Sequence, residues 1–121
     1  MKRFFIIFFG IVFLFGCVPS HALDDLKSLK PSEAKVELAN DSSIILLDVR
    51  NKDEWEEDHL EGSLLIPLNE LKDRVDGEIV DKNARIFVYC QGGKRSREAG
   101  RVLVKMGYVN VYDIGGIDNW P

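Results

Sequence analysis

The sequence is poor in the residues that hold metals or cross-link a chain. Its 121 residues include two cysteines, Cys17 and Cys90, and two histidines. No group of these residues has the spacing of metal ligands. We therefore expect no metal site, no cofactor and no internal disulfide.

An excess of positive charge is also missing. Residues 23–121 contain 14 Lys and Arg residues against 20 Asp and Glu residues. A surface that binds nucleic acid is usually basic, so this balance argues against a nucleic-acid partner.

No apolar run is long enough to span a membrane. Phe4 to Gly16 is almost wholly apolar and follows a short basic start, but it has 13 residues, whereas a spanning helix needs roughly 20. A basic start and a short apolar run are typical of a secretory signal, and an uncleaved anchor is the weaker interpretation.

Two cleavage sites compete. Ser20-His21-Ala22 suits an ordinary signal peptidase and predicts a signal peptide over 1–22 and a domain over 23–121. Leu14-Phe15-Gly16-Cys17 resembles a bacterial lipobox, which predicts a signal over 1–16 and lipid on Cys17. Both alternatives predict a periplasmic or otherwise exported bacterial protein, and only the second attaches it to the membrane.

Either cleavage leaves Cys90 as the one free thiol of the mature chain. A buried structural cysteine is the plain alternative, because free cysteine is often buried. However, Cys90 ends an apolar run and precedes two glycines and a basic cluster. That position favours use of the thiol over burial.

The rest of the chain alternates between strand and helix patterns. Apolar runs predict strands at 44–47, 63–67, 86–89 and 109–114. Helical spacing predicts helices at 31–38, 51–59 and 68–75, and a fourth after residue 93 with Ala99, Val102, Leu103 and Met106 turned inward. This alternation indicates an α/β domain with a parallel sheet and helices on both faces.

The segment after Cys90 predicts an anion-binding loop. Gly92 and Gly93 allow the backbone to curl, and the helix that follows offers its free first-turn N–H groups. Lys94, Arg95, Arg97 and Arg101 add positive charge near the loop. For Arg97 and Arg101 the alternative is that they belong only to the solvated face of the helix. Such a loop stabilises a thiolate, the reactive form of cysteine.

The residues resemble a single-domain rhodanese, a member of a sulfurtransferase family. The resemblance covers nearly everything after residue 29 and rests on several segments in the family's order: Leu47–Arg50, Glu54-Trp55, His59–Ser63, Ile66-Pro67, Tyr89–Ser96, Val111–Ile117 and Trp120. Asp58 and Glu61 depart from the family's usual glycine and proline. The resemblance implies the three-layer rhodanese fold, with about five parallel strands.

It also implies a reaction. Cys90 would take the outer sulfur of thiosulfate or a similar small anionic donor as a persulfide and pass it to cyanide or a thiol. Gln91, Gly92, Gly93, Lys94, Arg95 and Ser96 would bind the donor. Asp48 and Arg50 more plausibly brace the loops than take part in the chemistry. A non-catalytic binding module, or a sulfur carrier dedicated to one partner protein, is the alternative.

Loop length separates this hypothesis from a phosphatase or an arsenate reductase. Relatives of this fold that hydrolyse phosphate place five residues between the cysteine and the arginine, whereas four separate Cys90 from Arg95. A phosphoryl group is larger than one sulfur atom, so the shorter loop favours sulfur transfer.

Overall fold

The computed structural model describes residues 25–121. Both predicted cleavage sites and Cys17 lie outside the described residues. None of the helices within residues 25–121 has the length and apolar character to cross a bilayer.

The described chain forms a five-stranded parallel sheet in the order β1-β5-β4-β2-β3. The elements along the chain are β1 (Lys27–Ser28), α1 (Pro31–Asn40), β2 (Ile45–Asp48), α2 (Lys52–Glu57), β3 (Leu64–Leu65), the 3-10 turn η2 (Leu68–Glu70), α3 (Leu71–Glu78), β4 (Ile86–Cys90), α4 (Lys94–Lys105), β5 (Val111–Gly116) and the 3-10 turn η3 (Ile117–Asn119). The predicted α/β class and parallel sheet are confirmed.

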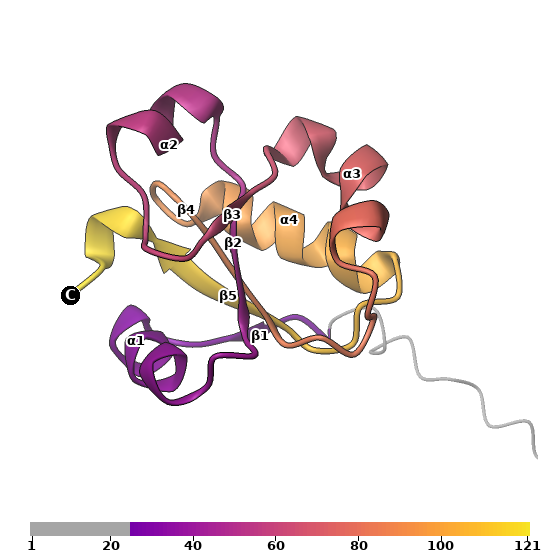
Figure 1. The fold of residues 1–121 in the computed structure, drawn as a ribbon, viewed down its shortest axis with the longest axis horizontal. Helices are drawn as coiled ribbons and strands as arrows, with labels where there is room; N and C mark the ends of the chain where they lie inside the picture. Colours follow the sequence, from indigo (N-terminus) through magenta and orange to yellow (C-terminus); the bar gives the residue numbers. More distant parts are fainter. Residues whose placement is uncertain (1–24) are drawn as a thin grey trace, which may run out of the picture.

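Helices cover both faces of the sheet, as predicted. Alternate strand residues divide between two apolar clusters. One cluster joins the sheet to α3 and α4 through Leu71, Val75, Ala99 and Leu103, and the other joins it to α1 through Ala34. Figure 1 shows α1 on one side of the strands and α3 and α4 on the other.

Two details differ from the predictions. The segment before α1 contains a short edge strand, β1, which pairs with β5 through Lys27 and Ser28. Two exposed polar residues carry no strand pattern, so only the neighbouring strand defines them. The predicted helix at 68–75 begins as a 3-10 turn after Pro67 and continues to Glu78.

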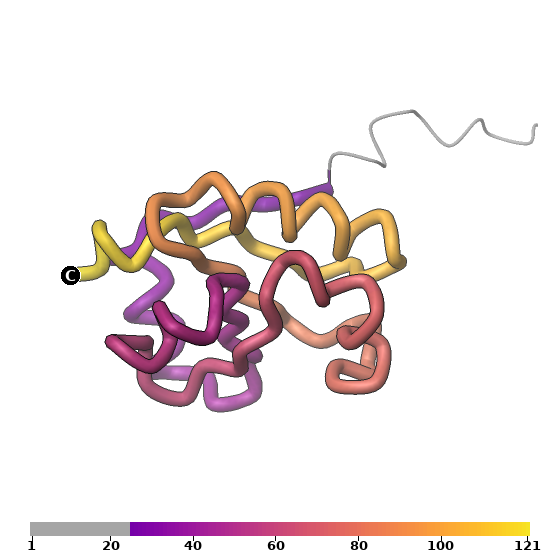
Figure 2. The backbone as a smooth tube through the Cα atoms, turned by 90° about the horizontal axis from the view of Figure 1, so that it is seen from above, coloured from indigo at the N-terminus to yellow at the C-terminus, as the bar shows by residue number. Residues whose placement is uncertain are grey.

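The topology places the Cys90 loop at the carboxyl end of the central strand. β4 is the middle strand, with β5 on one side and β2 on the other. Because all strands are parallel, their carboxyl ends meet at one edge, where ligands of open α/β sheets bind. β1 runs beside β5 and α4, as Figure 2 shows, and Leu26 packs against Gly100 of α4.

Candidate active site

The loop from Cys90 to Gly93 joins the end of β4 directly to the first turn of α4. Gly93 has φ +102°, in the left-handed region that favours glycine, and this residue starts the helix. Its N–H donates to Cys90 Sγ at 3.0 Å. The sulfur therefore lies beneath the loop, close to the N-terminal end of a helix of twelve residues.

Cys90 is buried, with 1% of its surface exposed. The prediction that its position favours use over burial is therefore wrong as to burial. β4 turns alternate side chains toward the α4 face, and the loop then covers the sulfur through the Gly93 amide. The glycine loop after Cys90, which we expected to leave the thiol available for reaction, thus encloses it.

The carboxyl end of β5 packs against the Cys90–Gly93 loop. The ladder between β4 and β5 is irregular, and it pairs Cys90 with Gly116. A Cβ atom on Gly116 would lie 2.1 Å from the Gln91 carbonyl oxygen, so only glycine fits there. The Asp118 N–H donates to the same oxygen at 3.2 Å. The loop and the β5–η3 turn are therefore packed backbone against backbone.

Ser96 braces the loop from inside α4. Its side chain is fully buried, and its hydroxyl lies 3.0 Å from the Gly93 carbonyl oxygen and 2.7 Å from Asp113 Oδ1. Asp113 Oδ1 also accepts the Gly115 N–H at 3.0 Å. The hydroxyl of Ser96 therefore ties the loop to β5, and its predicted role in binding the donor stays a prediction.

Arg95 is held by a carboxylate from another segment. Its Nη1 and Nη2 donate to Glu54 Oε1 and Oε2 of α2 at 2.7 and 2.9 Å. This two-point pair lowers the pKa of Glu54 to about 2 and raises that of Arg95. Glu54 takes two of the five N–H groups of the guanidinium, which leaves three for another acceptor.

A second arginine anchors the loop from the β2 side. Arg50 Nη2 and Asp48 Oδ2 lie 2.9 Å apart, and both side chains are buried. Arg50 Nη1 donates to Gln91 Oε1 at 2.9 Å. Burial by itself would lower the pKa of Arg50, but the bonds to Asp48 outweigh it and raise the value. The structure thus places Asp48 and Arg50 as supports behind the loop, while Gln91 is held as part of that support.

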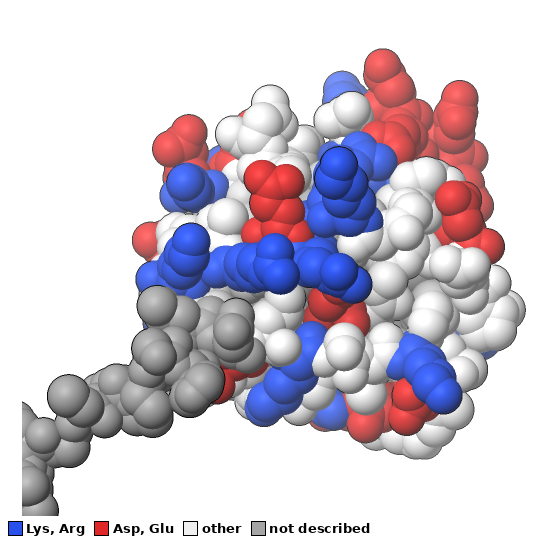
Figure 3. All heavy atoms as spheres, turned by 180° about the vertical axis from the view of Figure 1, so that it is seen from behind, with Lys and Arg blue, Asp and Glu red and all other residues white. Residues whose placement is uncertain are grey.

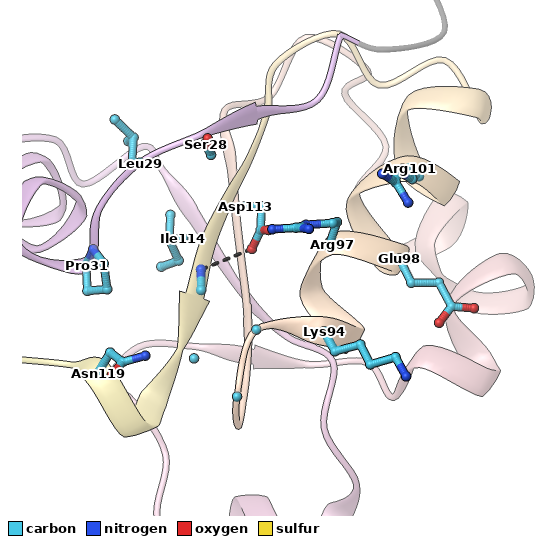
Figure 4. Close-up of a pocket in the computed structure, with 14 residues that line it drawn as sticks. Ser28, Leu29, Pro31, Lys94, Arg97, Glu98, Arg101, Asp113, Ile114 and Asn119 are labelled. Atoms are coloured by element: carbon cyan, nitrogen blue, oxygen red, sulfur yellow. Dashed lines mark hydrogen bonds and ion pairs between the residues drawn. The ribbon is translucent and has the colours of Figure 1, made fainter.

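A cleft of about 820 Å³ opens beside the loop, between α4 and the β1–α1 connection. Gly92, Gly93 and Lys94 line its loop end, and Gly115 and Gly116 line it nearby. Figure 4 shows Lys94, Arg97 and Arg101 along the α4 side of the cleft. Cys90 is buried and does not line the cleft, whereas Gly92 and Gly93, which follow it in the loop, do.

The structure thus brings the predicted loop residues 90–96 together with Asp48 and Arg50. Sequence reasoning missed three contributors: Glu54 as the partner of Arg95, Asp113 as the acceptor for Ser96, and Gly116 as the backing of Gln91. Glu54 belongs to the acidic run from Asp53 to Asp58, and a charge run of this kind is typical of a solvated helix face. Of the three, only Gly116 has a local signal in the sequence, because the pair Gly115-Gly116 is typical of a turn.

The structure thus places a buried thiol under a short glycine loop, at the carboxyl end of the central strand of a parallel sheet. The chain belongs to the rhodanese-like domain family, because the model of the family described as "Rhodanese-like domain" matches residues 30–121.

Named relatives agree with this assignment. Over 71 residues the chain is 38% identical to the thiosulfate sulfurtransferase PspE of Escherichia coli (strain K12), covering 59% of this chain and 68% of that one. Over 85 residues it is 34% identical to the thiosulfate sulfurtransferase GlpE of Coxiella burnetii, covering 69% and 78%. A solved structure of a rhodanese with anions from E. coli matches with a TM-score of 0.61 and 35% identity, covering 64% and 94%.

Proposed function

We propose that this protein is a thiosulfate sulfurtransferase in which Cys90 carries the transferred sulfur. The observation that carries the proposal is the contact between Cys90 Sγ and the Gly93 amide, in a loop that Arg95 closes after four residues. Its relatives PspE and GlpE, both named thiosulfate sulfurtransferases, support the same substrate class.

The first half-reaction loads the sulfur. The Cys90 thiolate attacks the outer sulfur of thiosulfate, a new S–S bond forms, and the S–S bond of the donor breaks. Sulfite leaves with the electron pair of that bond, and the enzyme holds a persulfide anion. The Gly93 N–H and the first-turn amides of α4 stabilise the charge on the outer sulfur as they stabilise the thiolate.

The second half-reaction unloads it. Cyanide or an acceptor thiolate attacks the outer sulfur, the persulfide bond breaks, and the Cys90 thiolate is restored. No external oxidant or reductant is needed, and two successive half-reactions predict ping-pong kinetics. Arg95 holds the anionic donor through the N–H groups that Glu54 leaves open, and Lys94 contributes charge at the loop end of the cleft.

The burial of Cys90 adds one requirement. Cys90 is buried and does not line the cleft, whereas Gly92 and Gly93 do, so we infer that this two-residue segment shifts when the donor enters. Gly92 is exposed and has no atom within 4 Å of where a Cβ would stand, whereas Gly93 lies against the Gly115–Gly116 backbone, so we expect the shift to occur at Gly92.

The test compares the thiosulfate:cyanide activity of the full chain, Cys90→Ala and Cys17→Ala. We expect no activity from Cys90→Ala and unchanged activity from Cys17→Ala, which removes the other thiol. Treatment with thiosulfate should add one sulfur atom to the intact mass of Cys17→Ala but not to that of Cys90→Ala. Equal activity of the two variants would refute the assignment, and a persulfide that cyanide cannot discharge would identify a dedicated carrier instead.

Accessibility of the thiol is measured separately. In Cys17→Ala, where Cys90 is the only thiol, an aromatic disulfide reagent should react under native conditions much faster than the domain unfolds. Reaction at the unfolding rate would show that the loop does not open, and would exclude catalysis at Cys90.

A further inference from the structure

The basic residues of the domain are concentrated on one helix. Residues 25–121 carry 14 Lys and Arg residues and 19 Asp and Glu residues, and α4 holds five of the former but one of the latter. Outside α4, acidic residues therefore outnumber basic ones by 18 to 9. Figure 3 shows a band of Lys and Arg side chains across the face that carries α4, with other Lys and Arg side chains lying apart from it.

Four of the five form a single row, which we call the α4 stripe: Lys94, Arg97, Arg101 and Lys105. Their spacing of three, four and four residues puts them on one face of the helix, and all four are exposed. The fifth basic residue, Arg95, points away from this row to its pair with Glu54.

Carboxylates within the described residues neutralise little of the stripe. Among residues 25–121, none lies within 4.0 Å of the charged groups of Lys94, Arg101 or Lys105, and the nearest to Arg97 is Asp113 at 3.9 Å. The Arg97 side chain is 67% exposed. The stripe therefore offers its charge to molecules in solution.

The stripe does not help the helix to form. Arg97 and Arg101, and Arg101 and Lys105, are like charges four residues apart, and each such pair destabilises a helix by about 0.2–0.5 kcal/mol. Lys94 and Arg97 also lie near the N-terminal end of α4, where the helix dipole disfavours cations. Lys105 lies in the last turn, where the dipole favours a cation, but helix formation gives no reason for the other three members of the row.

We propose that the α4 stripe is a docking surface for an acidic segment of the protein that accepts the sulfur. The inference rests on the proposed function. The row runs the length of α4, from its first to its twelfth residue, or about 16 Å along the helix, far more than a thiosulfate ion can occupy. It begins at Lys94, which adjoins the loop, and its first three members line the cleft. A chain aligned on the row places its thiol beside the Cys90 loop.

The charge outside α4 favours a local acidic segment over an extended polyanion. A nucleic acid or an anionic membrane would also face the acidic remainder of the domain, which repels it. A short acidic segment meets the stripe alone.

Three synthetic peptide thiols test the proposal on the persulfidated full chain. Each has one Cys and one Gly followed by five Glu, five Gln or five Lys residues, and transfer rates are compared per thiolate after titration of each peptide thiol. At about 0.01 M ionic strength we expect the Glu peptide to react about tenfold faster than the Gln peptide, and the Lys peptide more slowly. At about 1 M the three rates should converge.

Two charge reversals localise the effect. Arg101→Glu changes the stripe, and Lys35→Glu makes the same change in charge on α1, across the sheet from α4. Arg101→Glu should abolish the preference for the Glu peptide, whereas Lys35→Glu should keep it. Equal rates for the Glu and Gln peptides at low salt, or equal losses in the two variants, would overturn the proposal.

Further controls separate the possible failures. Transfer to 2-mercaptoethanol, a neutral thiol, should be the same in the wild type and both variants, and its absence would refute the proposed function rather than the docking surface. Sedimentation with phosphatidylglycerol vesicles that depends on Arg101, without any peptide preference, would assign the stripe to a membrane and overturn the proposal.

Discussion

Replacing Arg50 tests whether the buried pair beneath the loop supports the fold. Arg50 Nε lies 3.1 Å from both carboxylate oxygens of Asp48, and Nη2 lies 2.9 Å from Oδ2. The guanidinium also donates to Gln91 Oε1 and, at 2.6 Å, to the Asp58 carbonyl oxygen. Only 2% of Arg50 and none of Asp48 is exposed.

Arg50→Ala should lower the free energy of unfolding by about 3–5 kcal/mol. The loss is large because Asp48 would stay buried as a charge without the three guanidinium bonds, keeping the N–H of residue 50 at 2.8 Å. The free energy of unfolding of a domain is about 5–15 kcal/mol in total, so the variant would lose a large part of its stability. Equilibrium urea unfolding, followed by tryptophan fluorescence, measures the change.

Arg74→Ala is the matched control. Arg74 forms ion pairs with Glu70 and Glu78 at 3.5 and 3.0 Å, but it is 39% exposed. Exposed pairs contribute about 0–1 kcal/mol, so this variant should stay within about 1 kcal/mol of the wild type.

A double variant identifies the cause of the loss. Asp48→Asn combined with Arg50→Ala removes the orphaned charge, so it should be more stable than Arg50→Ala alone. If Arg50→Ala lost no more than Arg74→Ala, or if the double variant were the less stable of the two, the buried pair would not be what holds this edge of the sheet.

Three other perturbations probe the loop and its closing arginine. Gly116→Ala should lower the free energy of unfolding in urea by about 1–3 kcal/mol, because the added Cβ meets the Gln91 carbonyl oxygen. The control, Gly92→Ala, should change it by less than about 0.5 kcal/mol, and equal effects would refute the contact. The folded pKa of Glu54, about 2, lies below the ordinary 4.5, so its pair with Arg95 stabilises the fold fully above pH 4.5 and loses this contribution as the pH falls through 2. The pKa difference limits the contribution of the pair to the free energy of unfolding to about 3 kcal/mol, and solvent screening of the part-exposed pair reduces this to about 1 kcal/mol. The free energy of unfolding of the wild type should therefore fall more steeply than that of Glu54→Gln between about pH 5 and 2. Parallel curves would contradict this. Arg95→Ala should lower kcat/KM for thiosulfate about 10- to 150-fold. An unchanged kcat/KM would refute the role of Arg95 in binding the donor and would restrict it to its ion pair with Glu54.

Much of the architecture could be predicted because the signals are local. The apolar runs at 44–47 and 86–89 mark strands buried on both faces, and the inward row on α4 has helical spacing. The loop after Cys90 could also be predicted, since two glycines lie between a strand pattern and a helix pattern.

The site's internal bonds depended on the tertiary structure. Arg95 and Glu54 are 41 residues apart in the chain, and Ser96 and Asp113 are 17 apart. Periodicity describes which way a side chain points but not which distant segment packs against it, so these partners had no sequence signal.

The sequence by itself therefore determined that the domain is an α/β parallel sheet with one cysteine at a glycine-rich strand end. Only the tertiary structure decided that the thiol is enclosed, that Arg95 is already paired, and that the basic residues of α4 form an exposed row beside the loop. The reason is physical: backbone conformation follows mainly from near neighbours, whereas burial and pairing follow from how separate elements pack.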